Sequence, residues 1–336
     1  MYSHDNNAHG VDAMTNYTRL IVLTVIILII FLLFHSTLSS KETRLFRKIL
    51  SAQQFLWNSV GVDTEHDPYR SGFIGVEFSE ITTTLGSLPA KQCSTDPLWA
   101  VQFTRWFREL NLTRGDKVLV SASSSFPAMV YSCLAACEEL GLEVTFMLSL
   151  GSSSWGANRE GLNLAAMLDI LRRGGFLKTR PVFCTLGGTN ENAVGMDEET
   201  KRILQGSVSD DVMVKGLTLD ELVALKSGYI AGSKLVVNIG GNASSMGTDS
   251  MSLNLPAGIV YPSDNLDGGN GLAGNALRAG VPVLHVLNLK GLSEKCGIDF
   301  AARRSGFRRG RSILGGLLAG GVFAFFMITH KRWVYE

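Results

Sequence analysis

The sequence predicts an α/β domain with a mostly parallel, doubly wound sheet, set between two transmembrane helices and preceded by an irregular N-terminal extension. Three observations support this fold class. Short apolar runs recur through the middle of the chain and alternate with segments of helical periodicity. Glycine, serine and asparagine follow these runs, as they follow buried strands. Two longer apolar runs lie near the two ends of the chain.

Each of the two long apolar runs has the composition of a membrane span. Residues 20–38 (LIVLTVIILIIFLLFHSTL) approach the ~20 apolar residues that a spanning helix needs. Residues 312–329 (SILGGLLAGGVFAFFMIT) carry no charge, and the spacing of Gly316 and Gly320 allows close helix packing in lipid. The alternatives are buried core helices or, for the first run, a signal peptide, whose basic start and cleavage site the chain lacks. We therefore expect transmembrane helices at 20–38 and 312–329, with membrane lipid as a partner.

Basic residues flank the inner end of each expected span. They are Lys41, Arg44, Arg47 and Lys48 after the first, and Arg303, Arg304, Arg308, Arg309 and Arg311 before the second. Because cytoplasmic flanks are usually the more basic, residues 39–311 are expected on the cytoplasmic side of a membrane. A juxtamembrane helix at 39–60 either lies on the bilayer or packs on the domain. The other expected boundaries are a polar tail (1–19), the α/β domain (61–300), a basic linker (301–311) and a tail (330–336).

The composition excludes several classes of protein. With 336 residues, a net charge of +1 and 18% charged residues, the chain lacks the basic excess of a nucleic-acid binder. Its five cysteines include no Cys-x-x-Cys pair, so neither a zinc site nor a disulfide framework is indicated. We expect buried cysteines in a reducing compartment, no metal ion and no nucleic-acid partner.

The central part of the chain alternates strands with helices. Pro127 near the start and Gly141 at the end mark the helix that follows the first strand. Residues 61–94 show no helical period and are expected to be irregular and extended. Strands are expected at 116–121, 142–150, 181–190, 234–242 and 281–291, and helices at about 95–110, 127–140, 162–172 and 197–205.

Small polar residues gather at the carboxyl end of each expected strand. In an open parallel sheet, ligands bind outside these ends, at the point where the strand order reverses. A helix that begins at Pro127 would direct its free N–H groups toward the serines before it, which favours an anion. The same residue types are also routine caps in strand-to-helix turns. The candidate ligand-binding residues are Ser123, Ser124, Ser125, Ser152, Ser153, Trp155, Asn158, Gly187, Gly188, Gly240, Gly241, Asn242 and Lys290.

Stronger catalytic signatures are missing from these loops. Residues 121–125 lack the phosphate-loop lysine, the glycine pattern of a dinucleotide motif and the flanking glycines of a nucleophile elbow. His285 lies inside an expected strand, as buried structural histidines do. Glu77 and Glu80 have the chemistry of acid–base groups, but a solvated or structurally paired carboxylate is the commoner case. Motif reasoning therefore leaves the catalytic residues, any cofactor and the assignment as an enzyme open.

Five ordered stretches of the chain resemble the poly-gamma-glutamate system protein family. They are DPYRSGFIGVEFSEITTTLGSLPAK, GDKVLVSASSSFPA, SLGSSSWGAN, VNIGGN and GVPVLHVLNLKGL, and together they span roughly residues 66–295. The resemblance implies a bacterial, membrane-associated component of poly-gamma-glutamate (capsule polymer) synthesis or export. It also implies partners among the other proteins of that system, including a ligase that adds glutamate with ATP. It supplies no catalytic residue.

Three functions remain open at the level of sequence. The first is a membrane-anchored component that binds an anionic small molecule or a glutamyl group at the carboxyl edge of its sheet. The second is a hydrolase or transferase of gamma-glutamyl amide bonds that uses a serine of 123–125 as nucleophile. The third is a structural scaffold that holds a synthase or an exporter in place.

Overall fold

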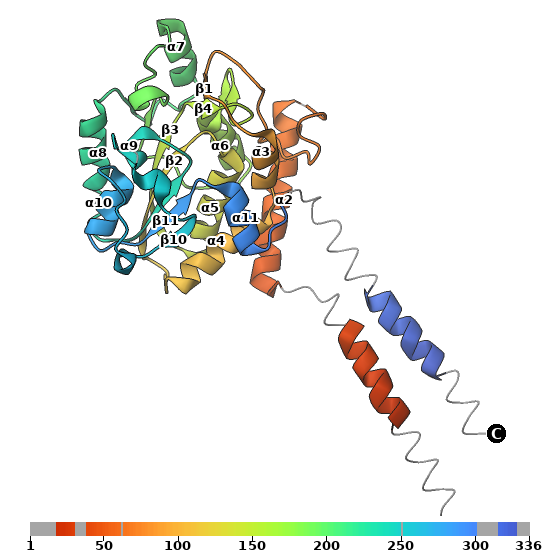
Figure 1. Ribbon diagram of the computed structural model, residues 1–336. Coiled ribbons are helices and arrows are strands. Elements are labelled where there is room, and N and C mark those ends of the chain that lie inside the picture. The colour runs from red at the N-terminus through yellow and green to blue at the C-terminus, as the bar shows by residue number, and fades with distance from the viewer. Residues whose placement is uncertain (1–17, 31–37, 62, 250, 301–314, 328–336) are drawn as a thin grey trace, which may run out of the picture. The chain divides into compact units, whose positions relative to one another are not determined.

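The computed structural model describes residues 18–30, 38–61, 63–249, 251–300 and 315–327. The chain divides into two compact units. One comprises Met1–Ser39 and Arg303–Glu336, and its described residues form helices over 18–30 and 315–327 (Figure 1). The other, Ser40–Ala302, holds the sheet and the remaining helices.

The two predicted transmembrane helices are not supported. Within the described ranges, no helix is both long enough and apolar enough to cross a membrane. The helices over 18–30 and 315–327 cover only part of the expected spans, and the predicted residues 31–37, 312–314 and 328–329 lie outside the described residues. The predicted fold class is wrong on this point, and the predicted membrane localisation, which depended on the two spans, is contradicted with it. The predicted cytoplasmic side of a membrane loses its basis.

The α/β character of the domain is confirmed, with a mixed sheet of seven strands. Their order across the sheet is β10-β11-β9-β2-β3-β7-β8. All neighbouring pairs are parallel except β10 and β11, and the sequence analysis missed this antiparallel edge strand. The strands are β2 (Lys117–Ser123), β3 (Glu143–Ser149), β7 (Phe183–Thr185), β8 (Val214–Lys215), β9 (Ser233–Ile239), β10 (Gly258–Val260) and β11 (Val283–Val286).

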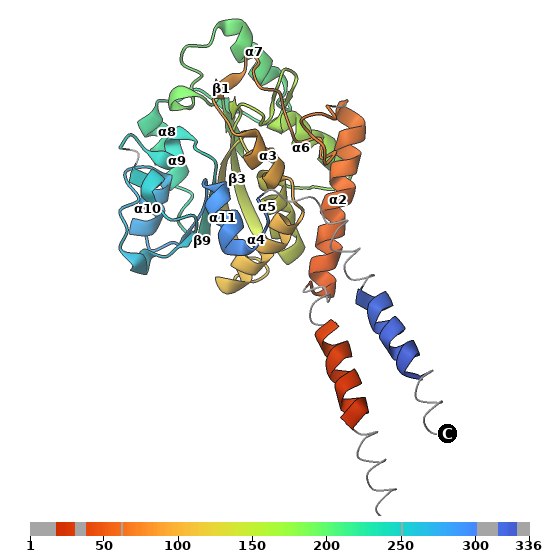
Figure 2. The ribbon, with the colours of Figure 1, turned by 45° about the vertical axis from the view of Figure 1, so that its right-hand side comes forward.

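Helices cover both faces of this sheet. Figure 2 shows α8, α9 and α10 on one side, and α4, α5 and α11 on the other with α2 beyond them. The helices of the domain are α2 (Ser40–Val60), α3 (Leu88–Ser94), α4 (Leu98–Glu109), α5 (Pro127–Leu140), α6 (Leu164–Arg173), α7 (Glu198–Gly206), α8 (Leu219–Ser227), α9 (Ala243–Met246), α10 (Leu272–Arg278) and α11 (Leu289–Cys296). Short 3-10 turns are η1 (Thr189–Glu191), η2 (Met251–Asn254) and η3 (Pro262–Asp264).

The helix expected at 39–60 packs on the domain. Leu45, Ile49 and Leu56 recur at helical spacing along α2 and are fully buried, against α4, α5 and α6. Burial of each such side chain stabilises the fold by about 1.5–3 kcal/mol. The domain, and not a bilayer, therefore accounts for the apolar face of α2.

Two small sheets complete the domain beside the serine loops. β1 (Thr82–Thr84) pairs in parallel with β4 (Ser152–Ser153), and β5 (Asn158–Arg159) pairs antiparallel with β6 (Leu162–Asn163). The β1–β4 pair carries residues 61–94 onto the loop that follows β3. The prediction that this whole segment is irregular is wrong at its end, where Leu88–Ser94 form α3 with a proline in the first turn.

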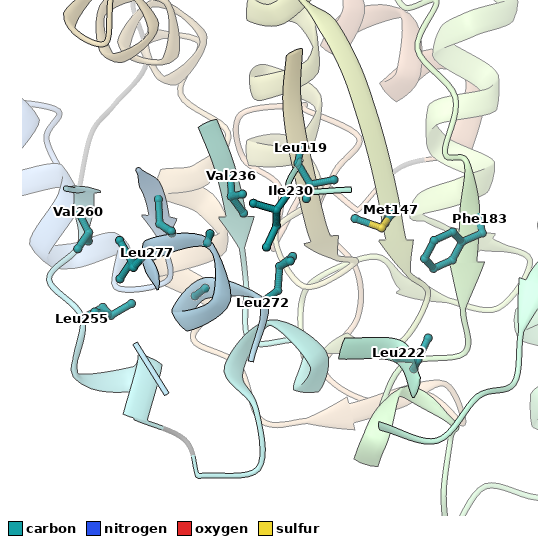
Figure 3. Close-up of a cluster of buried hydrophobic side chains, with 13 residues drawn as sticks. Leu119, Met147, Phe183, Leu222, Ile230, Val236, Leu255, Val260, Leu272 and Leu277 are labelled. Atoms are coloured by element: carbon teal, nitrogen blue, oxygen red, sulfur yellow. The ribbon is translucent and has the colours of Figure 1, made fainter. Parts of the chain in front are cut away.

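One cluster of buried apolar side chains lies between the sheet and the α8–α10 layer (Figure 3). Leu119 on β2, Val236 on β9 and Val283 on β11 form one apolar row across the strands, packed against Leu222 and Leu272. Because side chains on one face of a strand recur every second residue, the next row toward the carboxyl ends comprises Ser121, Asn238 and His285. The same face thus changes from apolar to polar at the edge where ligands bind in such folds.

Helix α5 begins at Pro127 and ends before Gly141, as predicted. Gly141 closes it in the left-handed conformation, with φ 69°, which glycine adopts without a steric penalty. The residue at its N-cap is Phe126, whose side chain caps no N–H group. The interpretation that the preceding serines cap this helix is therefore wrong.

Candidate functional site

The strand order reverses between β2 and β9. From β2 the chain builds outward through β3, β7 and β8, and then returns to place β9 on the opposite side of β2. Loops after β2 and β9 consequently diverge at their carboxyl ends, and ligands of doubly wound folds bind at such a point. The polar side chains at these ends define the candidate site.

A polar row crosses three neighbouring strands at this edge. Ser121 on β2 is in register with Asn238 on β9, which is in register with His285 on β11, and all three are buried. The Asn238 amide nitrogen lies 3.2 Å from His285 Nδ1. Burial lowers the pKa of His285 to about 4, so its ring is neutral near pH 7.

The Ser121 hydroxyl is surrounded by donors. Asn242 Nδ2 donates to it at 2.8 Å, Ser245 Oγ lies 3.0 Å away, and Lys226 Nζ lies 3.4 Å away. Asn242 and Ser245 stand at the start of α9, just after β9, whereas Lys226 belongs to α8. The Ser121 hydroxyl thus links β2 to α9, which follows β9, and to α8, which follows β8.

Lys226 forms a buried ion pair with Glu191. Its Nζ lies 3.0 Å from one carboxylate oxygen and 3.3 Å from the other, and both side chains are 1% exposed. Burial raises the pKa of Glu191, but Lys226 and hydrogen bonds from Ser244 and Thr185 outweigh it, so that the pKa is lowered. Glu191 is therefore ionised and matched in charge inside the domain.

The backbone that holds Glu191 is strained. Asn190, Glu191 and Ala193 have φ values of 55°, 59° and 50°, in the left-handed region that side chains disfavour. Each such residue costs about 1–3 kcal/mol and persists where the surrounding contacts determine it. The preceding Gly187 and Gly188, with φ 83° and 68°, start this turn. The predicted glycine loop thus serves to place a carboxylate that the sequence analysis did not select.

Several buried polar atoms at this edge have no hydrogen-bond partner among the described residues. A buried polar group without a partner costs about 1–3 kcal/mol, so native proteins contain few. Gly240 brings its backbone against one of them: a Cβ there would lie 2.2 Å from Ser123 Oγ. The unpartnered atoms at the carboxyl ends of β2, β9 and β11 are Ser123 Oγ, Asn238 Oδ1, Asn242 Oδ1 and His285 Nε2.

The two predicted serine loops come together beside this row. The Ser124 hydroxyl donates to the Ser149 carbonyl oxygen, the Ser152 hydroxyl donates to the Ser124 carbonyl oxygen, and Ser125 Oγ accepts from the Ser153 N–H at 3.1 Å. Ser124 and Ser152 are fully buried. The hydroxyls of Ser124 and Ser152 therefore make hydrogen bonds within the protein. The hydroxyls of Ser123 and Ser153 are the ones in these loops whose role is still to be assigned.

Lys91 of α3 reaches into these loops. Its Nζ lies 2.8 Å from Ser153 Oγ, donates to the Ser125 carbonyl oxygen, and stands 3.8 Å from the centre of the Phe126 ring. The side chain is buried, and desolvation lowers the pKa of Lys91 to about 7. None of these three neighbours carries a charge.

Other predicted site residues take no part in the polar row. Trp155, with φ 63°, packs against His66, with ring centroids 4.6 Å apart and the two rings tilted by 35°. Asn158 uses its amide to bind Val76 through both N–H and C=O. Gly241 is exposed, and so is Lys290, for which the structure shows no side-chain hydrogen bond or ion pair within the described ranges. The predicted anion contact through Lys290 therefore has no support in this geometry.

Sequence reasoning missed four central residues: Lys91, Glu191, Lys226 and Asn238. It named Ser121 as part of the serine cluster but did not select it as a ligand-binding residue. Two of them carried a usable signal. Lys226 follows Leu222 by one helical turn and so falls on the apolar face of α8, and Asn238 interrupts a strand of aliphatic residues. Lys91 and Glu191 carried none, because only the fold brings them to their partners.

The described residues contain no cluster of three or more His, Cys, Asp or Glu that could hold a metal ion. The five cysteines are free, and burial raises the pKa of Cys93 and of Cys184 to about 12. These thiols are thus poor nucleophiles.

Comparisons with known proteins found no match. No family model, no curated protein and no solved structure matches this chain. They supply no link to poly-gamma-glutamate or to a capsule. The geometry of the site and the resemblance given above are the observations that bear on function.

Proposed function

We propose that this protein binds the amide of a glutamyl compound at the carboxyl edge of its sheet, between β2 and β9. The set of unpartnered buried atoms there is the observation that carries the proposal. Such atoms reduce stability, and a ligand that satisfies them explains why the chain retains them.

The chemistry of these atoms favours an amide over an anion. Since the Asn238 amide nitrogen donates to His285 Nδ1, the ring proton resides on Nε2, which is a donor. Asn238 Oδ1 and Asn242 Oδ1 are acceptors and would repel an anion. Lys226, the cation of the buried network, is already matched by Glu191. A carboxamide or peptide amide offers the acceptor and the donors that this arrangement lacks.

The resemblance to the poly-gamma-glutamate system family supports glutamyl compounds as the class of ligand. Of the two ligand types that the sequence left open, a glutamyl group in amide linkage is the one that supplies the amide that the unpartnered atoms favour. The role that follows is recognition of a glutamyl amide during synthesis or export of the polymer.

Calorimetric titration of the full chain tests this proposal. Glutamine, glutamate, gamma-glutamyl oligomers and ATP are the ligands. We expect glutamine or the oligomers to bind more tightly than glutamate and ATP, and Asn238→Leu to weaken that binding at least tenfold. Ser123→Ala is the second variant, because it removes one hydroxyl that has no partner among the described residues.

Asn275→Leu is the matched control. Asn275 is a partly buried amide on α10 that donates to Ser227 Oγ at 2.8 Å, away from the polar row. It is expected to leave affinity unchanged. Failure of all four ligands to bind the folded wild type, or equal losses in Asn238→Leu and Asn275→Leu, would assign the unpartnered atoms to ordered water and remove the proposal.

A further inference from the structure

A second arrangement on the same edge, distinct from the polar row, has the parts of an acyl-transfer centre. It is formed by Lys91 and Ser153, with the amino-terminal end of α5 beside them. It does not depend on the identity of the ligand proposed above.

The first part is the contact between Lys91 Nζ and Ser153 Oγ, 2.8 Å apart and within reach for proton transfer. A serine hydroxyl is a weak nucleophile until a base takes its proton, and a neutral lysine amine can be that base. Burial disfavours the charged form of lysine, and here it lowers the pKa of Lys91 to about 7. The pair therefore meets the geometric and the electrostatic requirement together.

The second part is the position of α5. Lys91 Nζ donates to the Ser125 carbonyl and lies over Phe126, the N-cap residue of α5, while the Ser153 N–H donates to Ser125 Oγ. Phe126 caps no N–H group of the first turn with its side chain. The amino-terminal end of a helix carries a partial positive charge, which stabilises an oxyanion formed nearby.

The third part is a strap over the pair, residues 84–87. A Cβ at Gly86 would lie 3.0 Å from Ser153 Oγ and 3.2 Å from Lys91 Cε, so the backbone of the strap covers both groups. Leu85 beside it is 81% exposed. Glycine is what allows this close approach, and displacement of the strap would open Ser153 to solvent.

We propose that Ser153 is a nucleophile, and Lys91 its general base, for hydrolysis or transfer of an acyl group from an amide or ester. Ser153 Oγ forms a bond to the carbonyl carbon while its proton passes to Lys91 Nζ. Lys91 then gives that proton to the leaving amine or alcohol as the C–N or C–O bond breaks, which leaves an acyl-serine. Water attacks the acyl carbon, Lys91 takes its proton and returns it to Ser153, and the acid is released.

This assignment differs from the serine nucleophile predicted from the sequence at 123–125. Ser124 donates its hydroxyl to the Ser149 carbonyl, and Ser125 accepts from the Ser153 N–H. Among the described residues, the side-chain base that reaches a serine of these two loops is Lys91, and the serine that it reaches is Ser153.

A fluorophosphonate probe tests the proposal on the full chain. The probe forms an Oγ–P bond and loses fluoride, and mass spectrometry locates the labelled serine. We expect label on Ser153, none in Ser153→Ala, and unchanged labelling in the neighbouring control Ser154→Ala. Lys91→Met should slow labelling by at least about 10²-fold, the usual contribution of a general base.

The pH dependence of wild-type labelling provides a readout that needs no variant. The rate should rise with pH to a plateau with an apparent pKa near 7, and Lys91→Met should abolish this dependence. No label on the folded wild type, label that persists in Ser153→Ala, or a rate indifferent to pH between 6 and 8 would overturn the proposal. If the wild type binds glutamine but takes no label, the proposal for Lys91 and Ser153 fails and the proposal for the polar row stands.

Discussion

Two buried lysines of this domain stand beside serine hydroxyls and differ in one respect. Lys226 Nζ lies 3.4 Å from Ser121 Oγ and 3.0 Å from a Glu191 carboxylate oxygen. Lys91 Nζ lies 2.8 Å from Ser153 Oγ, with a carbonyl oxygen and an aromatic ring as its other neighbours. The carboxylate makes the first lysine part of an ion pair, whereas its absence lets the second give up its proton near neutral pH.

A buried lysine beside a serine hydroxyl therefore has a structural role in one place and a chemical role in the other. In the Glu191 network the charges balance and the hydrogen bonds are made, so the lysine connects α8 to the turn before α7. Beside Ser153 the amine is desolvated and its three close neighbours carry no charge, an arrangement that lowers its pKa and produces a base. Buried lysine is thus informative about function only together with its counter-ion.

The largest expected effect comes from breaking the ion pair. Glu191→Gln or Lys226→Met leaves the other charge buried and uncompensated, and should lower the free energy of unfolding by about 3–5 kcal/mol. Lys91→Met removes no balancing charge and should change it by less than about 1.5 kcal/mol at pH 8. Urea unfolding at pH 8 measures all three.

The double variant Glu191→Gln/Lys226→Met checks the cause. Both charges are gone, so its loss of stability should be smaller than the sum of the single losses. Additive losses would show that the two side chains act separately, and a loss in Lys91→Met as large as that in Lys226→Met would erase the distinction between the two lysines.

The pH dependence of stability should also distinguish the lysines. Lys91 has a pKa of about 7 in the folded protein and 10.5 as its ordinary value. Between these values the unfolded chain binds a proton that the folded protein does not, so stability rises with pH across this window. Tyr131 and the buried cysteines, whose pKa values are raised, act in the opposite direction at high pH. The measurement is therefore the difference between wild type and Lys91→Met, which should grow in favour of the wild type from pH 7 to 10.

His285 should produce a smaller effect of the same sign at lower pH. Its pKa is about 4 in the folded protein against an ordinary 6.5. Between these values the unfolded chain carries the extra proton, so stability falls as the pH drops from 6.5 to 4. Unfolding midpoints at pH 7 and pH 5 should differ more in the wild type than in His285→Gln. Equal differences would mean that the folded ring titrates normally.

The sequence predicted local structure well wherever local chemistry determines it. Helix α5 begins at Pro127 and ends before Gly141 as expected, because proline and glycine specify those ends whatever the tertiary context. The predicted spans are wrong, because no helix among the described residues is long and apolar enough to cross a membrane. Strand β10 was missed because three residues at a sheet edge carry little periodic signal.

The site was predicted as a region but not as a set of contacts. The loops at the strand ends lie on one edge, where any doubly wound sheet places them, and their role in ligand binding stays a prediction. Lys91 and Ser153 are separated by 62 positions, and Glu191 and Lys226 by 35. No local pattern encodes such pairings, and so the choice between a capping serine, a cradling serine and a nucleophile depended on the fold.

The smallest expected effect concerns two serines on one face of β2. Ser121 Oγ is approached by three donors, whereas Ser123 Oγ is buried and without a partner among the described residues. Ser121→Ala leaves those donors unsatisfied and should cost about 1–3 kcal/mol, whereas Ser123→Ala removes an unsatisfied hydroxyl and should gain up to about 1 kcal/mol. Urea unfolding of the ligand-free protein measures both signs. The two variants remove the same atom from positions two residues apart on one strand. The effects of strand propensity and of helix contacts therefore cancel when their changes in stability are compared. A loss of stability in both variants would mean that Ser123 has a partner in solution, and the argument for a ligand at this edge would then lose one of its four atoms.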